Sequence, residues 1–360
     1  MSNFPLTVKA GTTALQQIAE SGWKPELFGT LVGASGGAKL LGIAHLDRFL
    51  FGNYLQRSQH AMELYGSSIG SWRHAALAAD EPLNAIITLQ ERYLNQRWDE
   101  HDKRSPREIV DALCDWVLDG FCTPPLQSRI CDHRRFTTHI VTARGRGLNN
   151  HTAGVRLGTG MMASAMSNAV TRRTLGFAFQ RVVFSSGSSE AFQFRDFDTM
   201  HVPLTPQTVR PALVASGSIP FLMSGESDIP GAPKGQYWDG GIVDYHFDFS
   251  NFQGEGLVLY PHFTDRVIPG WFDKPLPWRR STGDLLDRVV ILAPSKDYLA
   301  RLPFGKIPDR KDFNRMSQPE RLDYWQKAME ASRELAEAFD QVISDTDPLK
   351  RVSPFNHGQS

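Results

Sequence analysis

Apolar positions in the first eighty residues follow two different spacings. Residues 12–21, 38–51 and 69–79 carry apolar side chains three and four positions apart, which is typical of amphipathic helices. Residues 28–33 and 60–65 are short segments that run into glycine-rich turns, as strands do. The order strand, turn, helix therefore occurs twice, and it predicts an α/β fold with a parallel sheet.

The rest of the chain continues this mixture of short apolar segments and longer amphipathic ones. Residues 82–119 are rich in helix-forming and polar residues, and residues 303–312 read as a loop. We expect further strands at residues 140–142, 181–184, 257–260 and 289–292, and helices at residues 159–173, 209–216 and 319–344. The expected fold class is α/β, with a mostly parallel central sheet sandwiched by helices.

The expected domain organisation is simple. We predict one domain over residues 1–345, with residues 246–345 as its C-terminal extension, and a loose tail over residues 346–360. The chain has 360 residues, of which 41% are hydrophobic, and this is ample for a sizeable core.

Charge and targeting signals narrow the functional classes. Lys and Arg together number 39, as do Asp and Glu, and this zero net charge argues against a nucleic-acid partner. The N-terminus lacks a signal-peptide pattern, and no apolar run has the length of a membrane span. Three cysteines, an odd number without zinc-site spacing, fit thiols in a reducing compartment. We therefore expect a cytoplasmic protein.

Two segments share the pattern Gly-x-Ser-x-Gly, which can mark a strand-to-helix turn that holds a nucleophilic serine. The first is residues 33–37, with Ser35 at its centre, and the second is residues 66–70, with Ser68. In the second, Gly66 and Gly70 flank a serine that would lie at a helix N-terminus, where the amide of Ile69 can donate to an oxyanion.

The first turn has a different character, because Gly36 and Gly37 are adjacent. Consecutive glycines let successive backbone amides point at one position, and such a nest can hold the oxyanion of a tetrahedral intermediate. Lys39 follows as an electrostatic or structural partner of the turn. A phosphate-binding loop needs Gly-Lys-Ser/Thr, and a dinucleotide fingerprint needs Gly-x-Gly-x-x-Gly; neither pattern is present.

A candidate base lies far downstream. Asp239 precedes Gly240 and Gly241 and follows an aromatic pair, which places a carboxylate at the end of a short strand, in a tight turn. A serine nucleophile needs a base, and Asp239 can supply one.

Taken in order, the glycine-rich turn ending in Lys39, the Gly-x-Ser-x-Gly turn and the Asp-Gly-Gly segment resemble the patatin-like phospholipase family. A further likeness is Ala-Ser-Gly-Ser-Ile-Pro at residues 215–220. The resemblance covers roughly residues 28–245. It implies a Ser-Asp dyad of Ser68 and Asp239, with an oxyanion hole at Gly36, Gly37 and Ile69.

The resemblance also decides between the two serines, because the family places its oxyanion turn before the nucleophile. It implies a lipid acyl hydrolase of the phospholipase A or lysophospholipase type, which forms an acyl-serine intermediate. Its partner is an acyl lipid, reached through peripheral contact with a membrane, and no metal or cofactor is needed. The chain departs from the family pattern at Ser35 and Leu40, in the oxyanion turn.

Other functions remain open from the sequence. An α/β-hydrolase triad would need a late histidine, and His246, His262 and His357 are available. A lipid-binding or scaffold protein of the same fold would tolerate the changes at Ser35 and Leu40.

Two arginine pairs are further candidates for contact with a membrane. Arg172 with Arg173, and Arg279 with Arg280, could attract anionic headgroups, but solvated surface positions are the simpler expectation. The neighbouring aromatic residues, such as Phe263 and Trp278, fit either an interface or ordinary packing.

Overall fold

A computed structural model describes residues 4–99 and 101–355. Its centre is one eleven-stranded sheet with the order β11-β1-β10-β9-β2-β3-β4-β5-β6, and β8 pairs with β4 and β7 beside this path. The strands are β1 (Leu6–Ala10), β2 (Phe28–Gly33), β3 (Met62–Ser67), β4 (Phe136–Gly145), β5 (Phe179–Ser185), β6 (Thr199–Pro203), β7 (Glu226–Ser227), β8 (Gln236–Asp239), β9 (Leu257–Pro261), β10 (Val289–Pro294) and β11 (Val352–Pro354).

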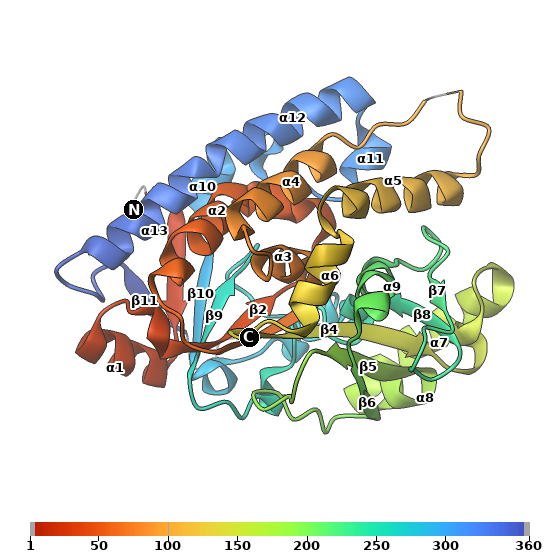
Figure 1. Ribbon diagram of the computed structural model, residues 1–360, viewed down its shortest axis with the longest axis horizontal. Coiled ribbons are helices and arrows are strands. Elements are labelled where there is room, and N and C mark those ends of the chain that lie inside the picture. The colour runs from red at the N-terminus through yellow and green to blue at the C-terminus, as the bar shows by residue number, and fades with distance from the viewer. Residues whose placement is uncertain (1–3, 100, 356–360) are drawn as a thin grey trace.

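Helices flank this sheet, as Figure 1 shows. They are α1 (Thr12–Ser21), α2 (Ala44–Gly52), α3 (Ile69–Leu77), α4 (Pro82–Leu94), α5 (Pro106–Phe121), α6 (Pro124–Cys131), α7 (Gly154–Val170), α8 (Leu175–Ala178), α9 (Pro206–Gly217), α10 (Lys296–Arg301), α11 (Asp312–Arg315), α12 (Gln318–Ala331) and α13 (Arg333–Ser344). The helices α2, α3, α4, α12 and α13 form one layer, while α7 and α8 lie beyond β4 and β5. Among the described residues, none of the helices has both the length and the apolar character that crossing a bilayer requires.

The middle of the sheet is parallel, which fixes where a site can form. β10, β9, β2, β3 and β4 all run in the same direction. Every residue of β9, β10 and β5 is buried, as expected for strands covered on both faces. The carboxyl ends of β2, β3 and β4 therefore meet at one edge of the sheet, where ligands bind in open α/β folds.

The predicted α/β class with a mostly parallel sheet is confirmed. The helix Thr12–Ser21 and the strand Phe28–Gly33 have the predicted bounds. The second strand lies at Met62–Ser67 and its helix at Ile69–Leu77, close to the expected residues 60–65 and 69–79. The repeated strand, turn, helix order is thus present.

The long helix expected at residues 319–344 is wrong in one respect, because it is two helices that meet at Ser332. The hydroxyl of this buried serine donates to the carbonyl of Met329 at 2.5 Å and accepts from the amide of His45 at 3.0 Å. A serine hydroxyl that bonds the backbone competes with the helix ladder. The helix is interrupted there, and α13 packs against α2.

The expected loose tail at residues 346–360 is also corrected over its described part. β11 pairs in parallel with β1, with Val8 opposite Val352, and Phe355 is buried. β1 would otherwise be an edge strand with unpaired amides and carbonyls, and the tail covers that edge. Residues 356–360 lie outside the described part of the chain.

Candidate active site

Ser68 occupies a sharp turn between β3 and α3. Its backbone angles are φ 55° and ψ −130°, a left-handed conformation that few non-glycine residues adopt. Two hydrogen bonds through Ser216 fix the turn. The amide of Ser68 donates to the hydroxyl of Ser216 at 2.9 Å, and that hydroxyl donates to the carbonyl of Val141 at 2.7 Å. Such strain persists only where surrounding contacts enforce it.

The glycines of the motif are required by close backbone approach. A Cβ atom on Gly70 would lie 2.0 Å from the carbonyl oxygen of Gly33, and one on Gly66 would lie 2.4 Å from the Cα atom of Ser71. Gly33 opens the upstream turn. The two Gly-x-Ser-x-Gly segments therefore touch each other through backbone atoms, with no room for a side chain between them.

Asp239 is the last residue of β8 and receives two hydrogen bonds. Ser68 Oγ donates to Asp239 Oδ2 at 2.8 Å, and the amide of Gly241 donates to Asp239 Oδ1 at 2.7 Å. β3 and β4 are parallel and β8 pairs with β4, with Asp239 opposite Thr142. The sheet thereby brings together two residues that are 171 positions apart in the sequence.

The surroundings of Asp239 shift its proton affinity. Its side chain is buried, and burial raises the pKa of the carboxyl group from 3.8 to about 6, although the hydrogen bonds from Ser68 and Gly241 favour the charged form. A carboxyl group with this pKa is ionised at neutral pH, yet it binds a proton much more readily than an exposed aspartate. That balance suits a general base.

The upstream turn lies against the residue before Ser68 and carries backbone amides that are unpaired in the described structure. Gly36 packs against Phe263, since a Cβ there would lie 2.4 Å from the ring, and Gly37 has a left-handed φ of 55°. Ser35 Oγ lies 3.0 Å from Ser67 Oγ, which ties this turn to the residue before Ser68. Within the described chain, the amides of the three candidate oxyanion-hole residues have no acceptor; these residues are Gly36, Gly37 and Ile69.

The structure shows what surrounds Ser35 and Leu40, the two residues that depart from the family pattern. Leu40 is fully buried in the hydrophobic core, and Ser35 donates its amide to the carbonyl of Tyr245 at 2.9 Å. Lys39 Nζ lies 3.5 Å from the Tyr245 hydroxyl. Burial alone would raise the pKa of this phenol, but the charges of Lys39 and Lys274 outweigh burial and lower it. Lys39 is thus an electrostatic neighbour of the turn.

The candidate histidines of a triad lie elsewhere. His246 accepts from the amide of Ile268 at 3.1 Å, and His262 bonds Thr264. Both rings are fully buried, and burial holds the pKa of His262 down at about 3 and that of His246 well below 6.5. In the described structure neither ring hydrogen-bonds Ser68 or Asp239, and His357 lies outside the described residues.

Three residues near the site were missed or misjudged from the sequence. Ser216 holds the Ser68 amide. The hydroxyl of Tyr93 lies 3.3 Å from where a Cβ on Gly37 would be. Arg172, expected at the surface, is buried and pairs with Asp244, Asp196 and Asp273. No local pattern marks these roles, since each depends on partners far away in the chain.

No protein-family model matches the chain, and no curated protein matches it. Among residues 4–99 and 101–355, no three His, Cys, Asp or Glu side chains gather as metal ligands would.

The backbone contact beneath Ser68 can be tested by adding one methyl group. We expect Gly70→Ala to lower the free energy of unfolding by about 3 kcal/mol, the upper end of the overpacking range, because backbone rather than a side chain must move. Urea denaturation measures this change. Gly158→Ala is the control, since a Cβ there meets nothing within 4 Å, and it should be neutral or slightly stabilising. Equal stability of the two variants would contradict the contact.

Proposed function

We propose that the protein is a serine acyl hydrolase that cleaves carboxylic esters of lipids through a Ser-Asp dyad. The observation that carries this proposal is the hydrogen bond of 2.8 Å from Ser68 Oγ to a buried Asp239 carboxylate. A serine on a strained strand-to-helix turn, next to a base and to unpaired amides, has the parts that acyl transfer requires.

The reaction would proceed in two halves. Ser68 Oγ attacks the ester carbonyl carbon while Asp239 accepts its proton, and the negative oxygen of the intermediate is held by the amides of Gly36, Gly37 and Ile69. Asp239 then gives the proton to the leaving alcohol, which departs and leaves an acyl-Ser68 ester. Water, deprotonated by Asp239, attacks that ester; Asp239 then returns the proton to Ser68 Oγ as the bond between Oγ and the acyl carbon breaks, which releases the fatty acid and restores the enzyme.

The substrate class comes from the resemblance to patatin-like phospholipases. It favours acyl lipids as substrates, in a reaction of the phospholipase A or lysophospholipase type, in the cytoplasm or at a membrane surface. The scheme uses only side chains and amides of this chain, so it calls for no metal or cofactor.

The alternative is a lipid-binding protein of the same fold that has lost catalysis. The departures from the family pattern at Ser35 and Leu40 support this alternative. Two observations favour the hydrolase. Leu40 is buried in the core, and the amides of Gly36 and Gly37 are without acceptors in the described structure. A fluorophosphonate probe separates the two functions, because it labels Ser68 only if this serine is activated.

The first functional prediction concerns the dyad. We expect Ser68→Ala and Asp239→Asn each to lower kcat on p-nitrophenyl esters of graded chain length by at least about 10³-fold, because the nucleophile and its base act as a unit. Circular dichroism should show a preserved fold. His246→Asn, which keeps the acceptor for the Ile268 amide, should retain activity. An active Ser68→Ala enzyme would end the proposal, and loss of activity in the histidine variant would favour a triad.

The second prediction concerns pH. Asp239 must be ionised to accept the proton, and its pKa is raised to about 6. Activity should therefore be half-maximal near pH 6 and level off about one pH unit higher, whereas an unshifted aspartate would give full activity above about pH 5. The pH profile of kcat/KM measures this. A kcat/KM that stays constant from about pH 4.5 to about pH 8 would show that no such base operates, because this range includes the pKa of Asp239.

A further inference from the structure

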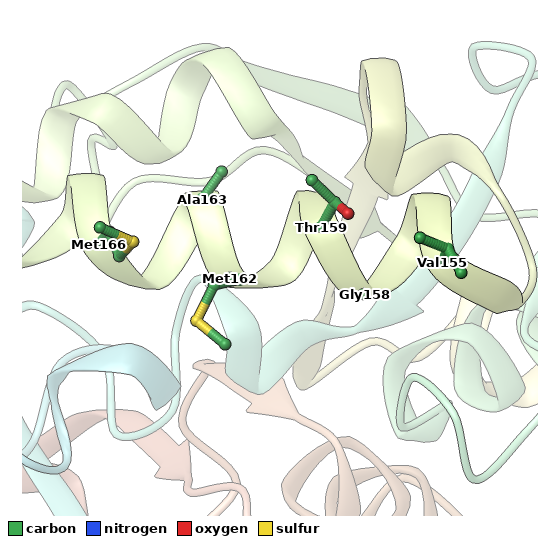
Figure 2. A pocket seen from close by; sticks show the side chains of 6 residues that line it. All are labelled: Val155, Gly158, Thr159, Met162, Ala163 and Met166. Carbon is green, nitrogen blue, oxygen red and sulfur yellow. The ribbon is translucent and has the colours of Figure 1, made fainter.

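One helix near the candidate site exposes an apolar stripe. α7 presents Val155, Met162, Met166 and Val170 to solvent, with exposed fractions of 86%, 65%, 69% and 81%. Residues four and seven apart share one side of a helix, so the stripe is about 22 Å long at 1.5 Å per residue. A shallow hollow of about 540 Å³ along this stripe is lined by α7 residues alone, as Figure 2 shows.

The opposite side of α7 packs against the rest of the protein. Leu157, Met161 and Asn168 are buried there. The helix carries a single charged residue, Arg156, in seventeen positions. A helix at a protein surface normally turns polar side chains outward, and a contiguous apolar face that remains exposed marks an interaction surface.

The chain around α7 is cationic although the whole protein is neutral. The 57 residues from 133 to 189 contain eight arginines and neither Asp nor Glu. Arg156 and Arg173 are exposed, and neither forms an ion pair with any residue in the described part of the chain. The apolar stripe is therefore bordered by positive charge.

A tryptophan joins the stripe at its C-terminal end. The segment η9 (Pro277–Arg279) is tied to α7, because Arg279 donates to the carbonyls of Asn168 and Val170, both at 3.1 Å. The neighbouring Trp278 is 65% exposed. Tryptophan is enriched where proteins meet the boundary between lipid and water, since its ring is apolar and its N–H is polar.

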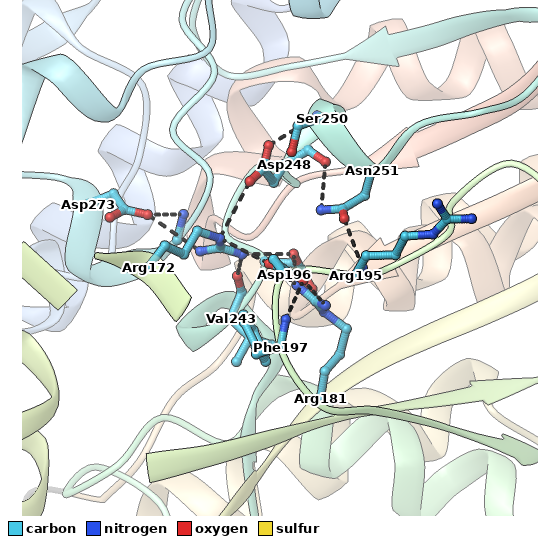
Figure 3. Close-up of polar contacts among 12 residues, drawn as sticks. Arg172, Arg181, Arg195, Asp196, Phe197, Val243, Asp248, Ser250, Asn251 and Asp273 are labelled. Carbon is cyan, nitrogen blue, oxygen red and sulfur yellow. Dashed lines mark hydrogen bonds and ion pairs between the residues drawn. The ribbon is translucent and has the colours of Figure 1, made fainter. Parts of the chain in front are cut away.

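A cavity of about 600 Å³ lies beside Trp278, and the arginines that line it add positive charge to this surface. Arg173, Arg195 and Arg280 line it, together with the buried Arg172. The acidic residues of this cavity are all engaged by Arg172, as Figure 3 shows; they are Asp196, Asp248 and Asp273. The outer arginines therefore remain available to an external anion.

We propose that this α7 surface docks on a lipid bilayer that contains anionic headgroups. The α7 surface consists of the apolar stripe, Trp278 and the three arginines Arg156, Arg173 and Arg280. Apolar side chains enter the acyl boundary while the arginines meet lipid phosphates. A second copy of the chain fits less well, because a symmetric contact would set the arginines of both copies against each other.

The position of the α7 surface suits the proposed hydrolysis. β4 ends at Gly145 at the same sheet edge as Ser68, and the chain then leads into α7. Asn168 of α7 donates to Asp273 at 2.7 Å, next to Lys274, whose charge acts on Asp239. Docking would bring bilayer lipids to the edge that holds the dyad, but binding itself does not depend on hydrolysis.

The test uses the full chain carrying Ser68→Ala, so that binding is measured without turnover. Cosedimentation compares binding of the protein to vesicles of phosphatidylcholine alone and to vesicles containing about one-third phosphatidylglycerol. The affinity for the anionic vesicles should be at least about tenfold higher, because each arginine contributes roughly fivefold. Met162→Gln with Met166→Gln should weaken binding to anionic vesicles about tenfold. Arg156→Glu with Arg173→Glu should remove the preference for anionic vesicles.

Matched controls lie on other helices. Trp116→Gln changes an apolar residue that is 40% exposed on α5, and Lys327→Glu reverses an exposed charge on α12; both should bind like the parent. Parent-like binding by the double methionine variant, or equal binding to neutral and anionic vesicles, would overturn the proposal. So would a parent dimer in sedimentation velocity that the methionine changes dissociate, because the stripe would then be a contact between copies.

Discussion

The structure around Ser68 depends on backbone packed against backbone. Gly33 meets Gly70, Gly66 meets Ser71, and Gly240 would carry a Cβ only 2.1 Å from the carbonyl of Val141. No side chain fits at these contacts. They fix the position of α3 against β2 and β3. They also hold Asp239, at the end of β8 and opposite Thr142 of β4, within hydrogen-bonding distance of Ser68. The left-handed angle at Ser68 follows from this confinement, because the chain must leave β3 and enter α3 without separating from β2.

Burial then determines what the two polar groups can do. In water an aspartate holds its proton weakly and would be a poor base, but exclusion of water raises the pKa of Asp239 toward neutrality. The hydrogen bonds from Ser68 and Gly241 prevent a larger rise. The proposed dyad therefore does without a histidine for a physical reason: the carboxyl group itself titrates close to neutral pH. The buried rings of His246 and His262 are held neutral by the same exclusion of water.

The two proposals concern one end of the molecule. The carboxyl edge of the parallel strands holds Ser68, and the chain beyond β4 builds the α7 surface at that edge. Arg172 links them: it lies under the cationic cavity, pairs with Asp273, and pairs with Asp244 five residues after Asp239. A cluster of ion pairs at this place holds the segment after Asp239 to the base of α7, and it neutralises the acids that would otherwise repel an anionic surface.

The sequence by itself determined the α/β class, the alternation of helices and strands from α1 to α3, and the residues of the candidate dyad, but not strand β1 before them. These depend on local rules: the period of apolar residues, glycines where backbones approach, and motifs read in chain order. Only the tertiary structure decided the rest. Ser216 under Ser68, Arg172 among carboxylates, the break at Ser332 and the pairing of β11 with β1 all depend on partners far away in the chain. The exposed stripe of α7 belongs here too. Its residues read as an ordinary helix, and which side of a helix remains uncovered is fixed only when the rest of the chain has packed.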